Sequence, residues 1–387
     1  MADKKKQHYV PRFYLKKFSL NNSGRAINLF NIPSCKKIPN AKLYNQCYRN
    51  YFYGKDGTLE NILGGVESKA SEIIKKIILR GELGDKHTVL FYTVIQHFRT
   101  LYFSESMDEH YDKFYKNFFK KDIISIKITK EQLSRVKITR NNSSLHSIKI
   151  ACLYHYLACD LQLKILRISR DGLEFITSDN PVVFYNQFMP FQEIGSNTGL
   201  ASKGLQIFFP VSPKHLVMLY DSAVYGVGGK RDKIIELTEQ RDVEQLNRLQ
   251  FVSALENVYF SDINYDACKE YLSARKNRRV NKQHVKSFPK KNGADSIGSY
   301  KEDIRTDLEL SFVKVLKKAK RWRTKFQQKG FQPITTPVVR DERLLSDHKA
   351  FLKLVNEKQY PLSEFFEYLI EKESKNQIGR VCAPSAS

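Results

Sequence analysis

Four nitrogen-bearing side chains of this sequence could bind a phosphate group or transfer a proton beside it. His8 lies in an N-terminal stretch that is rich in aromatic residues and interrupted by Pro11. A histidine titrates near neutral pH and can act as a general acid or base. Arg12, Gln96 and Arg99 can donate hydrogen bonds to a phosphate or a developing oxyanion. The alternative for His8 is structural, with its ring bonded to the backbone and Pro11 fixing the loop.

Gln96 and Arg99 are three residues apart and are therefore neighbours on one face of a helix. The rest of that helix is apolar on nearly every face, so an inward arginine requires a partner. The partner is either a carboxylate or a bound anion, and the sequence leaves both open. His97 lies on the apolar stripe with Leu90 and Val94, which indicates a place in the core.

Two glutamates can complete such a site. Glu60 and Glu67 are seven residues apart, so both lie on the same flank of a helix expected over residues 59–78. Two carboxylates there can hold Mg²⁺, the one cofactor that the sequence suggests. The alternative is an ion pair with Arg12 or Arg99.

Asp179 lies in a Ser-Asp-Asn-Pro stretch that follows an expected strand. Asp and Asn before proline are typical of a tight turn, because their side chains bond the nearby backbone. The functional alternative makes Asp179 a base, a metal ligand or the carboxylate that orients His8.

Several of these residues lie in motifs that resemble those of the bacterial domain of unknown function 4238 family. That family begins with a "QHYVPRFYL-x-x-F" stretch, here residues 7–18, with its His and Pro as the signature. The family's central helix, its Ser-Asp-Asn-Pro turn, its Pro-x-Ser-Pro strand entry and a helical Asn are similar to residues 91–100, 177–182, 209–213 and 246–247. The motifs cover roughly residues 5–260 and imply a shared fold. The family has no established activity, so the resemblance implies no reaction.

Hydrophobic periodicity predicts the elements that position these residues. Short strands and loops are expected in the first 56 residues, followed by helices over 59–78, within 86–119 and over 130–160 and 237–255. Alternating residues predict a hairpin of 161–168 with 173–176, and further strands at 182–185, 205–209, 216–220 and 258–260. The expected fold is therefore α+β, a helical layer packed on a small antiparallel sheet with a basic helical C-terminal extension.

The charge of the chain favours a polyanionic partner. It has 65 Lys and Arg against 41 Asp and Glu, a formal net charge of +24. Nucleic acid fits best, because each neutralised phosphate releases a counterion. The alternatives are an anionic membrane surface as the partner, or a set of lysine-rich faces that only contact solvent.

Much of this charge lies in the last third of the chain. The expected organisation is a core domain of residues 1–263 and a basic, mostly helical region of residues 264–387. Stretches 275–291 and 314–329 each contain eight basic residues and no acid. The predicted nucleic-acid-binding residues are Arg275, Lys276, Arg278, Arg279, Lys282, Lys317, Lys318, Arg321, Trp322 and Arg323. Trp322 either stacks on a base or is buried beneath a solvated helix face.

Other classes of protein are disfavoured by what the sequence lacks. There is no P-loop, no dinucleotide-binding glycine motif and no nucleophile elbow. No apolar stretch is long enough to span a membrane, and the N-terminus is not a secretory signal. The six cysteines are scattered, as expected for reduced thiols in the cytoplasm.

The leading hypothesis is a cytoplasmic nuclease, with RNA slightly favoured over DNA and a toxic or anti-phage defence role as a plausible setting. His8 would move the proton of a 2′-hydroxyl or of water, while Arg12 and Arg99 stabilise charge on the phosphate. Gln96 and Asp179 would complete the site. The alternative is a non-catalytic nucleic-acid-binding or complex-assembly module, in which the same five residues form a buried polar lock. A weaker third hypothesis is an enzyme acting on a small anionic ligand.

Overall fold

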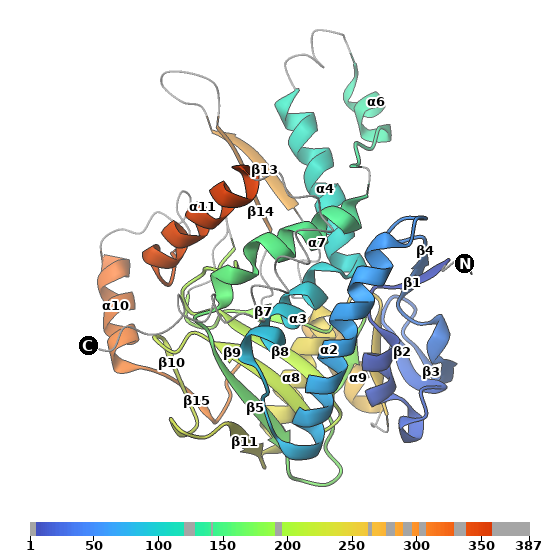
Figure 1. Ribbon diagram of the computed structural model, residues 1–387, viewed down its shortest axis with the longest axis vertical. Helices are drawn as coiled ribbons and strands as arrows, with labels where there is room; N and C mark the ends of the chain where they lie inside the picture. The colour runs from blue at the N-terminus through green and yellow to red at the C-terminus, as the bar shows by residue number, and fades with distance from the viewer. Residues whose placement is uncertain are drawn as a thin grey trace.

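The computed structural model describes residues 5–119, 128–140, 142–189, 196–261, 265–275, 283–288, 296–301, 307–328 and 338–357. Helices cover both faces of a five-stranded sheet, and smaller sheets lie beside it (Figure 1). The predicted α+β fold is therefore confirmed. Among the described residues, none of the helices combines the length and apolar character that a bilayer crossing requires.

The described helices are α1 (Arg12–Leu15), α2 (Thr58–Arg80), α3 (Lys86–Phe98), α4 (Leu101–Phe118), α6 (Lys130–Arg135), α7 (Ser143–Tyr154), α8 (Gln240–Ser253), α9 (Tyr265–Arg275), α10 (Lys317–Gln328) and α11 (Glu342–Glu357). The first half of the described strands comprises β1 (Lys6–His8), β2 (Ala26–Asn31), β3 (Lys36–Lys42), β4 (Tyr48–Asn50), β5 (Gln162–Ile168), β6 (Thr177–Ser178) and β7 (Val183–Tyr185). The remainder comprises β8 (Gln206–Ser212), β9 (His215–Tyr220), β10 (Tyr225–Val227), β11 (Ile234–Leu237), β12 (Asn257–Phe260), β13 (Gln283–Phe288), β14 (Ser296–Lys301) and β15 (Val313–Val315).

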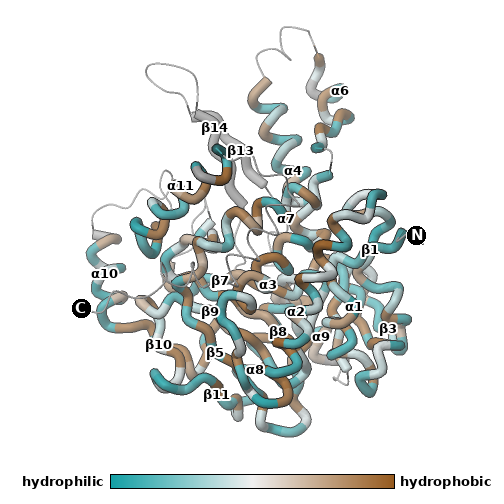
Figure 2. The backbone as a smooth tube through the Cα atoms, in the orientation of Figure 1, coloured by the Kyte–Doolittle hydropathy of each residue, from teal (hydrophilic) through white to brown (hydrophobic). Residues whose placement is uncertain are grey.

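The five-stranded sheet, in the order β11-β5-β9-β8-β7, is buried on both faces. Ile165 and Val217 face the cluster formed with α2, α3 and α7, whereas Leu166 and Met218 face the cluster formed with α8. Successive residues of a strand point to opposite faces, so a sheet covered on both sides has nearly continuous apolar strands. Figure 2 shows hydrophobic residues along β5, β8 and α3. The neighbouring strands are antiparallel, except that β11 runs parallel to β5.

Helix α3 is the central helix that the sequence predicts. Asp85 caps its N-terminus by accepting a hydrogen bond from the backbone N–H of Thr88. Residues 89–98 are all buried. Arg99 then ends α3, and Thr100 begins α4 by accepting a hydrogen bond from the backbone N–H of Phe103. The chain therefore turns at Arg99, which holds this residue at the junction of two helices.

The predicted hairpin of residues 161–168 with 173–176 is wrong. Strand β5 pairs with β9 on one side and with β11 on the other, so both of its edges are occupied. The segment that follows leaves this sheet, and β6 pairs with β12 of a separate four-stranded sheet. Alternation identifies a strand but not its neighbour, which is why the nearby turn misled the prediction.

The described residues beyond 306 pack directly on the preceding part of the chain. Strand β15 pairs with β10, and Ser311 donates two hydrogen bonds, from its backbone N–H and its hydroxyl, to the carboxylate of Asp242 on α8. Arg340 forms an ion pair with Asp160 at 2.8 Å and is 3% exposed. These contacts attach the C-terminal segments to both sides of the five-stranded sheet.

Candidate functional site

Arg99 is the centre of the most extensive polar contact set around the N-terminal motif. Its side chain is only 1% exposed. Nη1 donates to Glu67 Oε1 at 2.7 Å, Nε donates to the Tyr53 hydroxyl at 3.0 Å, and Nη2 donates to the backbone carbonyl of His8 at 2.9 Å. The guanidinium therefore joins α3, α2 and strand β1. Of the two partners left open by the sequence, a carboxylate and a bound anion, the structure shows the carboxylate.

The surroundings of Arg99 keep it charged. Burial alone lowers the pKa of Arg99, but the Tyr53 hydroxyl and the Glu67 carboxylate outweigh burial and raise that pKa above its ordinary value. Burial also raises the pKa of Tyr53 to about 12, against the opposing charge of Arg99. At neutral pH Arg99 is thus a cation and Tyr53 a neutral phenol.

Two glutamines attach the N-terminal motif to the same place. Gln96, fully buried on α3, donates to the backbone carbonyl of Tyr9 at 3.1 Å. Gln7 donates to the carbonyl of Gly54 at 2.8 Å and accepts from the backbone N–H of Tyr53 at 2.6 Å. Both amides bind backbone groups of a segment without regular helix or long strands, where side chains must replace missing backbone partners. Gln96 and Arg99 are therefore neighbours, as predicted, and both bind the backbone of residues 8 and 9.

His8 lies at the edge of this contact set and is only partly buried. Its Nε2 lies 3.2 Å from the backbone carbonyl of Tyr44. Because a carbonyl only accepts, Nε2 carries the proton, and Nδ1 of the neutral ring keeps its lone pair. The contact matches the structural alternative for His8, and Nδ1 retains the capacity to accept a proton.

The charge around His8 favours its neutral form. Burial lowers the pKa of His8 below its ordinary value of 6.5, and the backbone contact at Tyr44 opposes this effect. The cationic groups of Arg12, Arg99 and Lys6 lower the pKa further. Arg12 itself is exposed and lies over the Tyr44 ring, with 5.1 Å between its guanidinium carbon and the ring centroid. His8 and Arg12 thus share one aromatic neighbour.

Asp179 has a different set of partners from the other four predicted catalytic residues. It is 2% exposed. Its Oδ1 accepts from the backbone N–H of Leu255 at 2.7 Å, and Oδ2 accepts from the N–H groups of Glu256 and Asn257 at 2.7 and 2.9 Å. The carboxylate therefore satisfies the backbone between α8 and β12. The sequence predicts that Asp179 bonds the backbone of its own turn. In the structure it bonds backbone groups instead at residues 255–257, far along the chain.

Residues next to Asp179 strengthen the same connection. Asn180 donates to the carbonyl of Ser253 at 3.0 Å, and Gln250 donates to Ser178 Oγ at 2.6 Å. Asn247, on the same helix as Gln250, accepts from the backbone N–H of Ile176 at 2.9 Å. The stretch around residues 176–180 is thus held along one face of α8.

Glu67, one of the two glutamates predicted as metal ligands, is occupied by an ion pair. Glu67 is 26% exposed and forms the ion pair with Arg99, which is one of the two alternatives read from the sequence. Among the residues that the structure describes, no group of three or more His, Cys, Asp or Glu side chains is placed to hold a metal ion. Mg²⁺ binding by Glu60 and Glu67 stays a prediction.

The basic residues of α10 divide between its two faces. Lys317, Lys318 and Arg321 are exposed. Trp322 is half-buried, stacks on Phe326 with 4.7 Å between ring centroids and packs against the apolar cluster beneath the sheet.

Arg323 shares the inward face of α10. It donates to the backbone carbonyl of Phe188 at 2.9 Å, so it anchors the helix together with Trp322. Arg275 ends α9 and its side chain is not described, whereas Lys276, Arg278, Arg279 and Lys282 lie outside the described residues.

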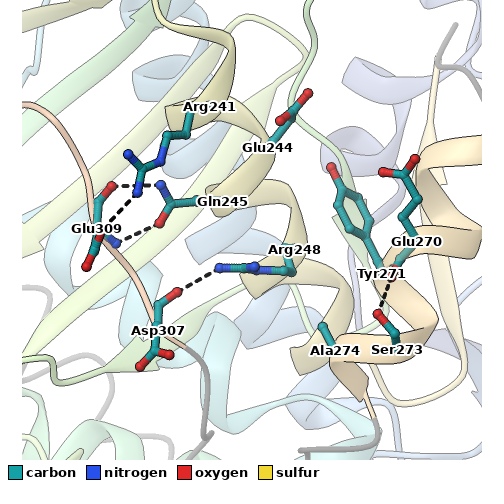
Figure 3. A pocket seen from close by; sticks show the side chains of 10 residues that line it. All are labelled: Arg241, Glu244, Gln245, Arg248, Glu270, Tyr271, Ser273, Ala274, Asp307 and Glu309. Atoms are coloured by element: carbon teal, nitrogen blue, oxygen red, sulfur yellow. Dashed lines mark hydrogen bonds and ion pairs between the residues drawn. The ribbon is translucent and has the colours of Figure 1, made fainter.

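A cavity of about 490 Å³ lies between α8, α9 and residues 307–309 (Figure 3). Arg241 forms an ion pair with Glu309 at 2.7 Å, and Arg248 donates to the backbone carbonyl of Asp307 at 2.8 Å. Gln245 both donates to and accepts from the backbone of Glu309. These contacts attach a C-terminal segment to α8, and the charges of the walls are mixed, which favours no single class of ligand.

One basic surface was missed by sequence reasoning. Residues 5–55 contain eleven lysines and arginines and not one Asp or Glu. The signal was present in the sequence as an acid-free run longer than either C-terminal stretch. It was overlooked because these basic residues are spread among aromatic residues instead of forming a dense cluster.

Comparison with known proteins gives one match. The sequence profile of a family described as "Protein of unknown function (DUF4238)" matches residues 6–264. No curated protein and no solved structure matches the chain.

Proposed function

Because the chain belongs to the DUF4238 family of proteins of unknown function, the family supplies no activity, and we propose from this chain's own residues that it is a nucleic-acid-binding protein. The observation that carries the proposal is the outer face of α10, which presents Lys317, Lys318, Lys320, Arg321 and Lys325. The absence of Asp and Glu from residues 314–329 and the net charge of +24 support it.

The cations on the outer face of α10 are exposed. In the part of the chain that the structure describes, none of these five side chains forms an ion pair. Trp322 and Arg323 hold the opposite face on the apolar cluster, so the outer face is held in a fixed position. A rigid row of unpaired cations binds phosphates and displaces their counterions.

The polar residues near the N-terminus support binding over catalysis. The Gln96 amide nitrogen, the Arg99 guanidinium and the Asp179 carboxylate each bind backbone groups or side chains of the same chain. The Oε1 atom of Gln96 is buried without a hydrogen-bond partner among the described residues. A side chain occupied in this way rigidifies the fold and is poorly placed to bind a substrate. These three residues therefore fit the polar lock better than a phosphodiesterase site.

Reversing the charge of the α10 face is expected to weaken binding strongly. The variant Lys317→Glu, Lys318→Glu, Arg321→Glu should lose about tenfold or more in affinity for a short labelled RNA, and its dependence on log salt should be about 2 units shallower. Fluorescence anisotropy at several salt concentrations measures both. The matched control, Lys76→Glu, Lys149→Glu, Lys230→Glu, makes the same charge change at exposed lysines elsewhere.

Failure of the wild-type protein to bind any RNA or DNA at low ionic strength would remove the proposal. An equal loss in the control variant would also count against it, because the effect would then come from net charge alone.

A second candidate function, an RNA-cleaving activity, is favoured by His8. Burial and the nearby cations lower the pKa of His8 below its ordinary value of 6.5, which favours the neutral ring at physiological pH. Nε2 contacts the carbonyl of Tyr44, and among the described residues no donor is hydrogen-bonded to Nδ1. In such a reaction Nδ1 takes the proton of a 2′-hydroxyl, whose oxygen then attacks the adjacent phosphorus and displaces the 5′-oxygen. Arg12 would stabilise the charge on the phosphate.

His8→Ala tests this candidate against the lock. RNA cleavage by the wild-type protein should persist in EDTA, weaken as the pH falls through the lowered pKa of His8 and the ring protonates, and disappear in His8→Ala at an unchanged melting temperature. Cleavage of labelled RNA and DNA, with Mg²⁺ and with EDTA, measures this. Absence of cleavage by both proteins would leave only the binding function. Cleavage that EDTA abolishes would instead support a metal ion bound by Glu60 and Glu67.

A further inference from the structure

The acid-free N-terminal segment presents a compact cluster of cations around two tyrosine rings. We name the Tyr44 surface for the residues Lys6, His8, Arg12, Tyr44 and Tyr48. The Nζ atom of Lys6 lies 4.4 Å from the centroids of both tyrosine rings. The Arg12 guanidinium lies 5.1 Å from the Tyr44 centroid. Tyr44 is 47% exposed, so an aromatic ring and two cations reach solvent together.

Lys6 and Arg12 supply the positive charge of this surface. The described residues include no ion pair of Lys6 or Arg12 with a carboxylate. Glu67, on the facing helix α2, is occupied by Arg99. The pKa of His8 is lowered first by burial and then by the charges of Arg12, Arg99 and Lys6, which is consistent with a cationic surface. Lys42, exposed two residues before Tyr44, extends the cationic surface.

We propose that the Tyr44 surface is a second nucleic-acid-binding surface, selective for single strands. Exposed aromatic rings accept unpaired bases by stacking, and neighbouring lysines and arginines bind the phosphates on either side. A base in a duplex is already stacked and does not reach the ring, so pairing should abolish the contribution of Tyr44. The choice of nucleic acid as the partner rests on the proposed function, but the residues of the Tyr44 surface are different from those of α10.

The position of the Tyr44 surface makes it separable from α10. Figure 1 places β1 and β4 at one side of the molecule and α10 at the opposite side. Substitutions at one surface therefore leave the other intact. A strand long enough to reach both would bind more tightly than either surface alone, because the second contact becomes intramolecular.

The test uses variants of the full chain with α10 unchanged. Tyr44→Ala should lose about 5- to 10-fold in affinity for short single-stranded RNA and DNA and less than about twofold for the matching duplex. Tyr44→Phe keeps the ring and should retain more of the affinity than Tyr44→Ala. The backbone carbonyl that contacts His8 remains in both. Anisotropy titrations measure the affinities, and melting temperatures confirm folding.

A second variant keeps the test valid if Tyr44→Ala does not fold. Arg12→Glu with Lys42→Glu alters two exposed side chains and should lose about tenfold in single-strand affinity with a shallower salt dependence. Its control is Lys149→Glu with Lys230→Glu, which makes the same charge change outside both surfaces.

The outcomes separate this inference from the proposed function. Wild-type protein that binds no nucleic acid overturns both. Wild-type binding that falls in the α10 variant but is unchanged by substitutions at Arg12, Lys42 and Tyr44 overturns only the Tyr44 surface. Equal losses for single strands and duplex would show that Tyr44 does not stack on a base. Tighter binding to anionic vesicles than to RNA at the same salt would assign the surface to a membrane instead.

Discussion

Arg99→Ala is expected to lower the free energy of unfolding by about 3–5 kcal/mol, which for many domains is enough to prevent stable folding. The substitution removes a buried cation that binds Glu67, Tyr53 and the carbonyl of His8. These groups are left in a largely dry site with no equivalent donor. Denaturant unfolding followed by circular dichroism measures the change.

The exposed ion pair of Arg135 with Glu131 is the control for Arg99. Both of its side chains are 76% exposed and four residues apart on α6, so Arg135→Ala should cost less than about 1 kcal/mol. Arg99→Lys should restore only part of the stability, because one ammonium group does not reproduce three donors in a planar fork. A stable Arg99→Ala protein that had lost RNA cleavage would contradict the lock and support catalysis.

The helices and strands of the central layers could be predicted from the sequence because each signal is local. Apolar residues recur at three-four spacing in α2 because one face of this helix is buried. Helix α3 is apolar on nearly every face because all of its faces are buried. The two faces of α10 were also readable, since Ala319, Trp322 and Phe326 recur at helical spacing and all face the apolar cluster. Which of the basic residues remain on the outer face follows from the same spacing.

The partners of the polar residues could not be predicted because they depend on how distant elements cross. That an inward Arg99 needs a partner follows from its apolar surroundings, but the choice of Glu67 depends on the packing of α2 on α3. The turn around Asp179 was similarly recognisable, whereas the backbone groups that it binds lie 76 to 78 residues later. The mispredicted hairpin after β5 has the same cause, since strand partners are chosen by tertiary packing.

Asp179→Ala is expected to lower the free energy of unfolding by about 3 kcal/mol or more, since hydrogen bonds to a charged group contribute most when they are buried. The substitution leaves the N–H groups of Leu255, Glu256 and Asn257 without their acceptor. These groups lead from α8 into β12, so the loss should loosen the attachment of that sheet. Urea unfolding of purified variants gives the difference.

Asp179→Asn distinguishes a structural carboxylate from a catalytic one. The amide keeps one oxygen acceptor but turns an NH₂ group towards backbone donors, so stability should fall by an amount between wild type and Asp179→Ala. Asp171→Ala, at an exposed aspartate in the turn that follows β5, should change stability by less than about 0.5 kcal/mol. If Asp179→Asn instead melted like the wild type and abolished RNA cleavage, the carboxylate would be acting on a substrate. The polar lock would then be the wrong account of this residue, because the backbone hydrogen bonds lost with one carboxylate oxygen would have proved dispensable to folding.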